Sequence, residues 1–257
     1  MHVYFFMDKE LKNKVALVTG ASSGIGAATS QVMAREGAKI AITYFKNEDG
    51  AKVVERSIKD AGGEVIRIKA DVTNEDEVTE MSRAVAKEFG KIDILVNNAG
   101  GFMERRTLLE SDRGYWQSVI ETNLSSVILV SNKVVPHMGE NGCIINVSST
   151  AAIRGGGKGA YAYAASKGGV STFSKALAKE LSGIPIRVLS VQPGLIDTPF
   201  HAKSKNSDIY NLAKGRILLK RPGNPQEVGE VISFLASSRA SFINGTAVTI
   251  DGGDSLV

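Results

Sequence analysis

The sequence is poor in cysteine and in long apolar runs. Its single cysteine, Cys143, has no second thiol for an intramolecular disulfide or a cysteine zinc cluster. No run reaches the roughly 18 apolar residues that a membrane-spanning helix needs, so no membrane contact is expected. The first residues also lack the apolar core of about 7–15 residues found in a secretory signal. We therefore expect a cytoplasmic protein, with residues 1–10 as a mobile N-terminal extension.

An excess of one charge is also lacking. The chain has 31 Lys and Arg against 27 Asp and Glu, and its only adjacent basic pairs are Arg105-Arg106 and Lys220-Arg221. Nucleic-acid binding needs a clustered basic face, so no nucleic-acid partner is expected. No residues show metal-ligand spacing, and no metal is expected. A hydrophobic share of 43% with 23% charged residues indicates a folded chain rather than a disordered one.

Short β-branched runs alternate along the chain with longer amphipathic stretches. This alternation predicts an α/β fold, a doubly wound (Rossmann) parallel sheet of about seven strands with helices on both faces. Without a linker or repeat, residues 1–257 are expected to form a single domain. Residues 198–220 are the least regular part and are interpreted as a flap over the substrate. The expected strands are 15–19, 39–44, 64–69, 92–96, 143–147, 186–191 and 246–250; the expected helices are 26–36, one ending near residue 60, 75–89, 112–135, 161–181, 199–214 and 225–237.

A glycine-rich turn, Thr19–Gly26, joins the first expected strand to the first helix. Gly20, Gly24 and Gly26 allow a tight turn, close approach of a pyrophosphate and close packing of helix on strand. The helix N-terminus then offers free N–H groups to phosphate. The spacing is G-x3-G-x-G rather than the commoner G-x-G-x2-G, but its place after the first strand of a βαβ pattern predicts a dinucleotide site.

The end of the second strand indicates which dinucleotide binds. An NAD site places an acid about 20 residues after the turn, to bind the adenosine ribose. Here Tyr44, Phe45 and Lys46 stand at that place, so a ribose 2′-phosphate would meet no repulsion and Lys46 would pair with it. Ser22 and Ser23 add hydroxyl donors. NADP(H) is therefore favoured, and NAD(H) stays open because no arginine occupies the turn.

Tyr163 and Lys167 lie four residues apart on an expected helix and so share one face. A neighbouring ammonium lowers the pKa of a phenol from its usual value of about 10. Such a tyrosine is a general acid that protonates a developing alkoxide, or a base for an alcohol in reverse. Ser148 and Ser149 follow the fifth strand, at the edge where doubly wound sheets bind ligands, and either hydroxyl would hold a substrate oxygen.

Together these motifs resemble the short-chain dehydrogenase/reductase family. The matches cover nearly the whole chain: the Thr19–Gly26 turn, Asn97-Asn98-Ala99-Gly100, Asn123, Ser149, Tyr163 with Lys167, Pro193-Gly194 and Asp251-Gly252-Gly253. The resemblance implies an NAD(P)-dependent oxidoreductase that interconverts a carbonyl and an alcohol. It also favours Ser149 over Ser148.

The resemblance implies a role for each matching residue. Tyr163 would donate the proton, Ser149 would orient the carbonyl, and Lys167 would lower the pKa of Tyr163 and bind the nicotinamide ribose. The backbone of Asn123 would hold a proton-relay water. Ser23 stands where many NADP-preferring members carry a basic residue. The implied cofactor residues are Gly20, Ser22, Ser23, Gly24, Ile25, Gly26, Tyr44, Phe45, Lys46, Asp71, Val72, Asn98, Ala99, Gly100, Tyr163, Lys167, Pro193, Gly194, Ile196 and Thr198.

The substrate is the least determined feature. Much of the chain resembles 3-oxoacyl-carrier-protein reductases, which bind an acidic carrier through a basic patch near the end of the long helix. Here no Lys or Arg lies between Lys133 and Arg154, so this activity is kept as the alternative. A small polar, sugar-like substrate is preferred. Arg154 and His201, with neighbouring lysines, suggest an acidic substrate, because arginine binds carboxylates in a bidentate manner. The flap also loosely resembles that of uronate reductases in the family, which implies a uronate-derived keto sugar as one example.

Two further expectations concern assembly and class. Members of the family associate through their long helices, here 112–135 and 161–181, so a homo-oligomer is expected, with a tetramer favoured over a dimer. A non-catalytic cofactor-binding sensor is the alternative of another class. The intact set of Ser149, Tyr163 and Lys167 argues against it.

Overall fold

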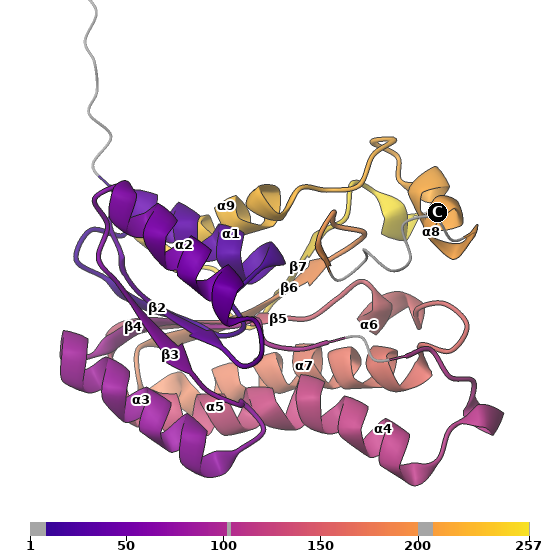
Figure 1. Cartoon of the computed structure of the whole chain (residues 1–257), viewed down its shortest axis with the longest axis horizontal. Coiled ribbons are helices and arrows are strands. Elements are labelled where there is room, and N and C mark those ends of the chain that lie inside the picture. Colours follow the sequence, from indigo (N-terminus) through magenta and orange to yellow (C-terminus); the bar gives the residue numbers. More distant parts are fainter. Residues whose placement is uncertain (1–8, 102–103, 200–207, 257) are drawn as a thin grey trace, which may run out of the picture.

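The computed structural model describes residues 9–101, 104–199 and 208–256. Within them, seven parallel strands form one sheet in the order β3-β2-β1-β4-β5-β6-β7 (Figure 1). The predicted doubly wound sheet is therefore confirmed. The strands are β1 (Val15–Val18), β2 (Lys39–Tyr44), β3 (Val65–Lys69), β4 (Ile92–Asn97), β5 (Met138–Val147), β6 (Ile186–Pro193) and β7 (Ala247–Ile250).

The strand order reverses between β1 and β4. The chain runs outward from β1 to β3, returns to pair β4 with β1, and then continues outward to β7. Ligands of doubly wound sheets bind outside the carboxyl ends of the strands at this switch point. The loops after β1 and β4 are therefore the first place to look for a site.

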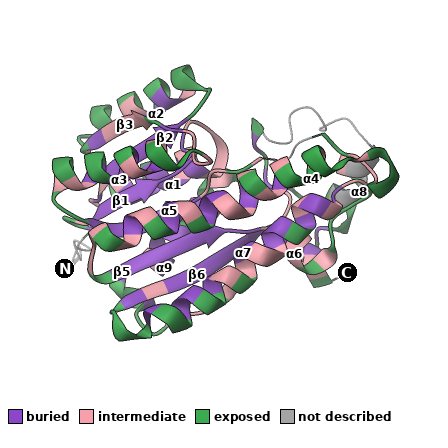
Figure 2. Ribbon diagram, turned by 90° about the horizontal axis from the view of Figure 1, so that it is seen from below, coloured by how far each residue is buried: buried purple, intermediate pink, exposed green. Residues whose placement is uncertain are grey.

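Helices cover both faces of the sheet (Figures 1 and 2). One layer holds α1 (Gly24–Arg35), α2 (Glu48–Asp60) and α9 (Pro225–Ala236); the other holds α3 (Glu75–Phe89), α4 (Arg113–Ile120), α5 (Ser126–Val134) and α7 (Tyr161–Glu180). Successive side chains of a strand point to opposite faces. Accordingly, Ala16 and Val18 pack in the core under the first layer, and Val15 and Leu17 in the core under the second. The central strands, such as β1 and β4, are buried on both faces (Figure 2), which is why they read as continuous apolar runs.

Local capping sets the ends of several helices. The Asn74 side chain accepts hydrogen bonds from the first-turn N–H groups of α3, and that turn is acidic, which suits the positive end of the helix dipole. Gly90 ends α3 with a φ of 85°. Asn224 and Glu227 form a reciprocal capping box at the start of α9, where Pro225 takes the first position.

The long helix expected over 112–135 is not a regular α-helix. A π-helical turn, Glu121–Ser125, separates α4 from α5, with Asn123 at its centre. Such turns widen a helix locally and are frequent at functional sites. The residue spacing of this segment fits an uninterrupted α-helix equally well, so the turn could not be predicted.

Other boundaries also differ from expectation. β5 begins at Met138 rather than at Cys143, because Met138 pairs with Ile92 across an irregularity in the register. A short helix, α6 (Ala151–Arg154), follows β5, and α8 spans Asp208–Arg216. Residues 1–8 and 200–207, and with them most of the expected N-terminal extension and part of the flap, lie outside the described residues. In the described ranges no helix has the length and apolarity needed to cross a membrane.

Candidate active site

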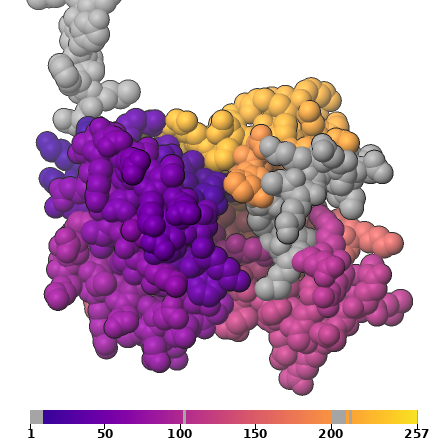
Figure 3. Space-filling model, in the orientation of Figure 1, coloured from indigo at the N-terminus to yellow at the C-terminus, as the bar shows by residue number. Residues whose placement is uncertain are grey.

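A cavity of about 1000 Å³ opens at the carboxyl ends of the strands. The space-filling view shows the surface hollowed between the N-terminal half and the segments coloured orange and pink (Figure 3). It is lined by the loops after β1, β2, β3 and β4, the start of α7, and the segments after β5 and β6. All the predicted site residues line it except Gly26, which lies behind the turn, and His201, which is outside the described residues.

The glycine turn takes the backbone shape that the pattern predicts. Gly20 and Gly24 have φ angles of 63° and 57°, in the left-handed region that favours glycine. A Cβ on Gly26 would lie 2.4 Å from Nδ2 of Asn98 and 2.7 Å from the carbonyl oxygen of Gly20. All three glycines therefore occupy positions that a residue with a side chain would strain or block.

Hydrogen bonds join this turn to the loop after β4. Thr19 Oγ1 accepts from the N–H groups of Asn98 and Ala99, both at 3.0 Å. Asn98 Nδ2 donates to the carbonyls of Thr19 at 2.9 Å and Gly20 at 3.0 Å. The two loops at the switch point are thus held together by one threonine and one asparagine.

The first turn of α1 suits a pyrophosphate. Its N-cap, Ser23, makes no side-chain capping bond, and no acidic residue lies in the turn. The first N–H groups of a helix have no partner within the helix, and they carry the positive end of the dipole. Gly24 and Ile25 line the cavity there. These backbone groups fit a dinucleotide phosphate.

The ends of β2 and β3 form the part of the cavity where the sequence predicts the adenosine of the cofactor. Tyr44, Phe45 and Lys46 line it together with Asp71 and Val72. The Asp71 carboxylate accepts from the N–H and the hydroxyl of Thr73, at 3.0 and 2.8 Å, so it is held in the loop. Asn47, which the sequence did not single out, also lines this end, and it caps α2 by accepting from the N–H of Gly50.

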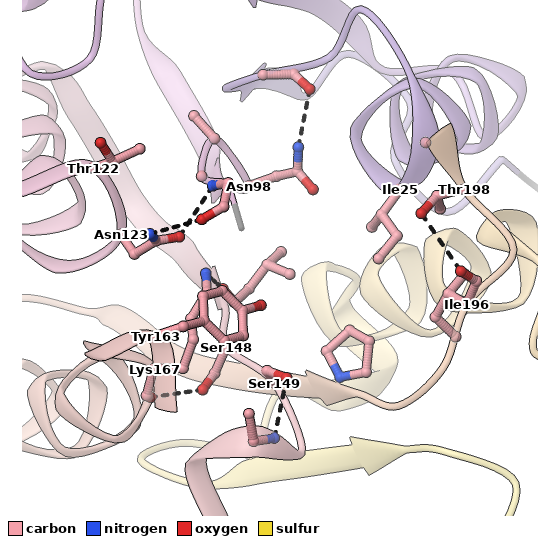
Figure 4. A pocket seen from close by; sticks show the side chains of 18 of the residues that line it. Ile25, Asn98, Thr122, Asn123, Ser148, Ser149, Tyr163, Lys167, Ile196 and Thr198 are labelled. Carbon is pink, nitrogen blue, oxygen red and sulfur yellow. Dashed lines mark hydrogen bonds between the residues drawn. The ribbon is translucent and has the colours of Figure 1, made fainter. Parts of the chain in front are cut away.

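Tyr163, Lys167 and Ser149 come together in the middle of the cavity (Figure 4). Lys167 is buried and its Nζ donates to the carbonyl of Val147 at 2.7 Å. Ser149 lies beside Tyr163 and acts to lower the pKa of its phenol. Ser148 is occupied elsewhere, because its Oγ donates to the carbonyl of Lys167 at 2.8 Å and also pairs with Ser171. The geometry thus favours Ser149 as the serine beside the tyrosine.

The electrostatics of this centre differ from expectation. Burial raises the pKa of Tyr163 to about 12, and the hydrogen bond with Ser149 only partly opposes that rise. Burial also lowers the pKa of Lys167 to about 8. The predicted lowering of the Tyr163 pKa by Lys167 is therefore wrong for this structure: desolvation dominates, and the Lys167 Nζ lies 5.9 Å from the ring centre of Tyr163. Tyr163 is a neutral phenol near pH 7, ready to donate a proton.

Asn123 connects the π-helical turn to the loop after β4 (Figure 4). Its side chain is fully buried; Oδ1 accepts from the N–H of Gly101 at 3.1 Å, and Nδ2 donates to the carbonyls of Gly101 and Val119, both at 2.9 Å. The amide thus ties that loop to the helix. The role of its backbone in proton relay stays a prediction.

The segment after β6 forms the opposite wall. Pro193, Gly194, Ile196 and Thr198 line the cavity. A Cβ on Gly194 would lie 2.6 Å from Cβ of Asp251, so the glycine lets the C-terminal segment approach β6 closely. The Asp251-Gly252-Gly253 match of the sequence is therefore part of the site's framework.

At the substrate end, Arg154 is not the free cation that the sequence suggested. Its Nη1 lies 2.8 Å from Oδ1 of Asp254, and the guanidinium also bonds the Asp254 carbonyl. Arg216 contacts the same carboxylate, and Arg105, Arg216 and Asp254 all line the cavity although the sequence analysis did not identify them. No local pattern marks them, because they come from separate segments. Among the described residues no three His, Cys, Asp or Glu gather as a metal site.

Comparisons with known proteins agree with this geometry. A family model described as enoyl-(acyl carrier protein) reductase matches residues 20–255. A 3-oxoacyl-(acyl-carrier-protein) reductase of Thermotoga maritima is 41% identical over 245 residues, covering 95% of this chain and 98% of the relative. A cis-4-hydroxycyclohexanecarboxylate dehydrogenase of Sinomonas cyclohexanicum is 38% identical over 253 residues, covering 98% and 100%. A short-chain dehydrogenase of Burkholderia cenocepacia solved in complex with NADP is 34% identical with a TM-score of 0.90, covering 95% of this chain and 99% of that one.

Proposed function

The chain belongs to the short-chain dehydrogenase/reductase family of oxidoreductases that act on CH–OH groups, and from that premise we propose that it interconverts the carbonyl and alcohol of a small polar, sugar-like substrate with NADP(H). The observation that carries the proposal is the meeting of Ser149, Tyr163 and the buried Lys167 in the cavity that starts at the glycine turn.

In the reductive direction, the bound cofactor supplies a hydride to the carbonyl carbon. Tyr163 donates its phenolic proton to the carbonyl oxygen, and its raised pKa keeps that proton in place near neutral pH. Ser149 holds the same oxygen by a hydrogen bond. Lys167, fixed by the Val147 carbonyl, supplies positive charge beside the phenolate that remains. In the oxidative direction the phenolate form of Tyr163 accepts the proton of the alcohol.

NADP(H) is proposed over NAD(H) because of the residues at the adenosine end. Lys46 lines the cavity there. Among the described residues no Glu lines the cavity, and the one Asp near that end, Asp71, accepts hydrogen bonds from Thr73. A cation without an opposing carboxylate favours a 2′-phosphate. The NADP complex of the similar Burkholderia protein supports the same choice.

An acidic substrate is favoured over a neutral one. The name of the Sinomonas relative states a substrate that carries a carboxylate as well as a hydroxyl. The second candidate is reduction of a 3-oxoacyl thioester on a carrier protein, favoured by the name of the Thermotoga relative. The absence of Lys and Arg between Lys133 and Arg154 weighs against a carrier-docking patch there. We further propose a cytoplasmic homotetramer built through α4–α5 and α7, which light scattering on a sizing column would test.

Initial rates would test the function directly. NADPH and NADH are compared against a uronate-derived oxo acid, neutral ketoses, an acetoacetyl thioester and an aromatic aldehyde, with Tyr163→Phe as the matched control. We expect NADPH-dependent reduction of the oxo acid that Tyr163→Phe abolishes. A preference for the thioester would favour the carrier-protein reaction. Turnover of nothing in the panel, with a cofactor-induced rise in melting temperature, would favour the non-catalytic sensor instead.

A further inference from the structure

Lys167 is held at both of its ends by two consecutive residues at the end of β5. Its Nζ donates to the carbonyl of Val147 at 2.7 Å, and its own carbonyl accepts from Ser148 Oγ at 2.8 Å. All three residues are buried, with exposed fractions of 6% or less. Tyr163 lies about one turn before Lys167 on α7. The two bonds therefore hold the part of the helix that carries the tyrosine.

Behind Ser148, a row of hydrogen-bonded side chains runs across the sheet towards its β7 edge. Ser148 Oγ pairs with Ser171 Oγ of α7 at 2.9 Å, and Ser171 accepts from Nε2 of Gln192 in β6 at 3.1 Å. Oε1 of Gln192 in turn accepts from Oγ1 of Thr249 in β7 at 3.2 Å. The row thus connects the end of β5 with α7, β6 and the edge strand.

The direction of each bond in this row follows from the number of protons available. A serine hydroxyl has a single proton. The proton of Ser148 is used on the carbonyl of Lys167, so Ser171 must donate to Ser148. Ser171 can then only accept, and the amide nitrogen of Gln192 is the donor that meets it. Every bond therefore points towards the Lys167 carbonyl, and hydrogen bonds aligned in this way polarise one another.

The helix is weak at the place where the row ends. Gly168 and Gly169 follow Lys167 directly, and glycine destabilises a helix interior because it loses the most conformational freedom on folding. Gly169 is required by packing, since a Cβ there would lie 2.7 Å from Cδ2 of Leu124 in the π-helical turn. A Cβ on Gly168 would meet no atom outside the helix closer than the Ala152 carbonyl oxygen, at 3.9 Å. The bonds that reach this turn from outside the helix therefore compensate for a local weakness.

We infer that Ser148 is a positioning residue: it completes the row of hydrogen bonds that holds the glycine-weakened turn of α7, and so keeps Tyr163 and Lys167 aligned for proton transfer. Although Ser148 and Ser149 both line the cavity, Ser148 acts through the helix and takes no part in the transfer itself. The inference rests on the proposed function, because the alignment matters only where Tyr163 donates the proton.

The first test removes the hydroxyl and compares two properties. In Ser148→Ala, kcat for the carbonyl compound that the wild type reduces fastest in the panel above should fall about 3- to 10-fold, the effect of one hydrogen bond. The dissociation constant for NADPH, measured by fluorescence titration, should stay the same, because the glycine turn is not altered. A loss of NADPH affinity as large as the loss of kcat would contradict the inference.

A second substitution distinguishes support of the helix from direct contact with the substrate. Gly168→Ala strengthens the turn, and its Cβ has room. Added to Ser148→Ala, it should raise kcat about 2- to 5-fold, because alanine favours the helix over glycine. A serine that held the substrate itself could not be replaced in this way.

Ser82→Ala is the matched control. Ser82 is also a buried serine whose Oγ donates to a carbonyl, that of Thr79 at 2.9 Å, but it lies on α3 and does not line the cavity. It should keep the wild-type kcat. Melting temperatures of both serine variants show whether a difference in kcat follows from a difference in stability.

The outcomes separate the two claims. A kcat for Ser148→Ala equal to that of Ser82→Ala, or a loss that Gly168→Ala does not recover, would overturn the positioning role and leave the proposed function standing. Absence of carbonyl reduction in the wild type would overturn the proposed function and the positioning role with it.

Discussion

The two ends of the cavity are built by different means. The nucleotide end is mostly main chain: a turn of three glycines, the free N–H groups of α1, and a loop held by Thr19 and Asn98. The end proposed for the substrate is mostly side chain: Arg154, Arg216 and Asp254 meet there from three separate segments. Backbone groups recognise what all dinucleotides share, whereas side chains can be exchanged without disturbing the sheet. The difference explains how one fold can keep its cofactor and vary its substrate.

The centre between these two ends uses main-chain and side-chain groups together. Tyr163→Phe tests this centre and should have the largest effect of the substitutions on activity. Removing the phenolic proton should lower kcat about 100- to 10,000-fold and leave cofactor binding intact, because the ring is kept. Stopped-flow rates and NADPH fluorescence titration measure the two properties. A variant that loses cofactor affinity to the same extent would place Tyr163 in binding rather than in chemistry.

Lys167→Met should increase the stability of the protein at neutral pH, whereas Gly26→Ala at the nucleotide end, described below, should decrease it. Burial holds the Lys167 pKa at about 8, below its usual 10.5, so the unfolded chain binds more protons between those values. Wild-type stability therefore rises with pH across that window. At pH 7 the variant should gain about 2 kcal/mol in the free energy of unfolding, after the lost Val147 bond is subtracted. The gain should shrink as the pH approaches 10.

Urea unfolding at pH 7 and pH 9.5 measures this gain, with Lys175→Met on the exposed face of α7 as the control. A variant less stable than the wild type at pH 7 would show that the ammonium stabilises the fold. The variant should be inactive in any case, so stability and activity are expected to move in opposite directions at this residue.

Gly26→Ala tests the main-chain end. Its Cβ would meet Asn98 Nδ2 at 2.4 Å, so the loop must shift, and about 1–3 kcal/mol of stability should be lost, together with most of the melting shift that NADPH produces. Gly183→Ala is the control, since no atom lies within 4 Å of the Cβ position there. If NADPH raised the melting temperature of both variants equally, the turn would tolerate a side chain and would not bind the cofactor through its backbone shape.

Lys46→Gln should give the smallest effect and tests the one place where the nucleotide end relies on a charge. Because Lys46 is exposed, its pairing with a 2′-phosphate contributes about 1 kcal/mol, so KM for NADPH should rise only several-fold and KM for NADH should stay the same. Lys69→Gln, exposed nearby but outside the cavity, is the control. A similar change in KM for both cofactors would show that Lys46 does not discriminate between NADPH and NADH.

Much of the site could be predicted where its residues are close in sequence. The glycine turn, the Tyr163–Lys167 spacing and the loop after β4 each depend on a few neighbouring positions, and all of them line or support the cavity. The π-helical turn at Asn123 could not be predicted, because its residue spacing fits an α-helix as well. The direction of the Tyr163 pKa was wrong because burial, which outweighs a nearby charge here, cannot be derived from spacing.

By itself the sequence determined the doubly wound sheet, since alternating strands and helices with right-handed crossovers leave few topologies, and with it the edge where the glycine turn and Tyr163 lie. Only the tertiary structure shows which carboxylate Arg154 and Arg216 contact. Asp254 lies 100 residues from Arg154 and 38 from Arg216, and no periodicity links positions that far apart. They share this carboxylate because packing of the C-terminal turn against α6 and α8 brings them within hydrogen-bonding distance.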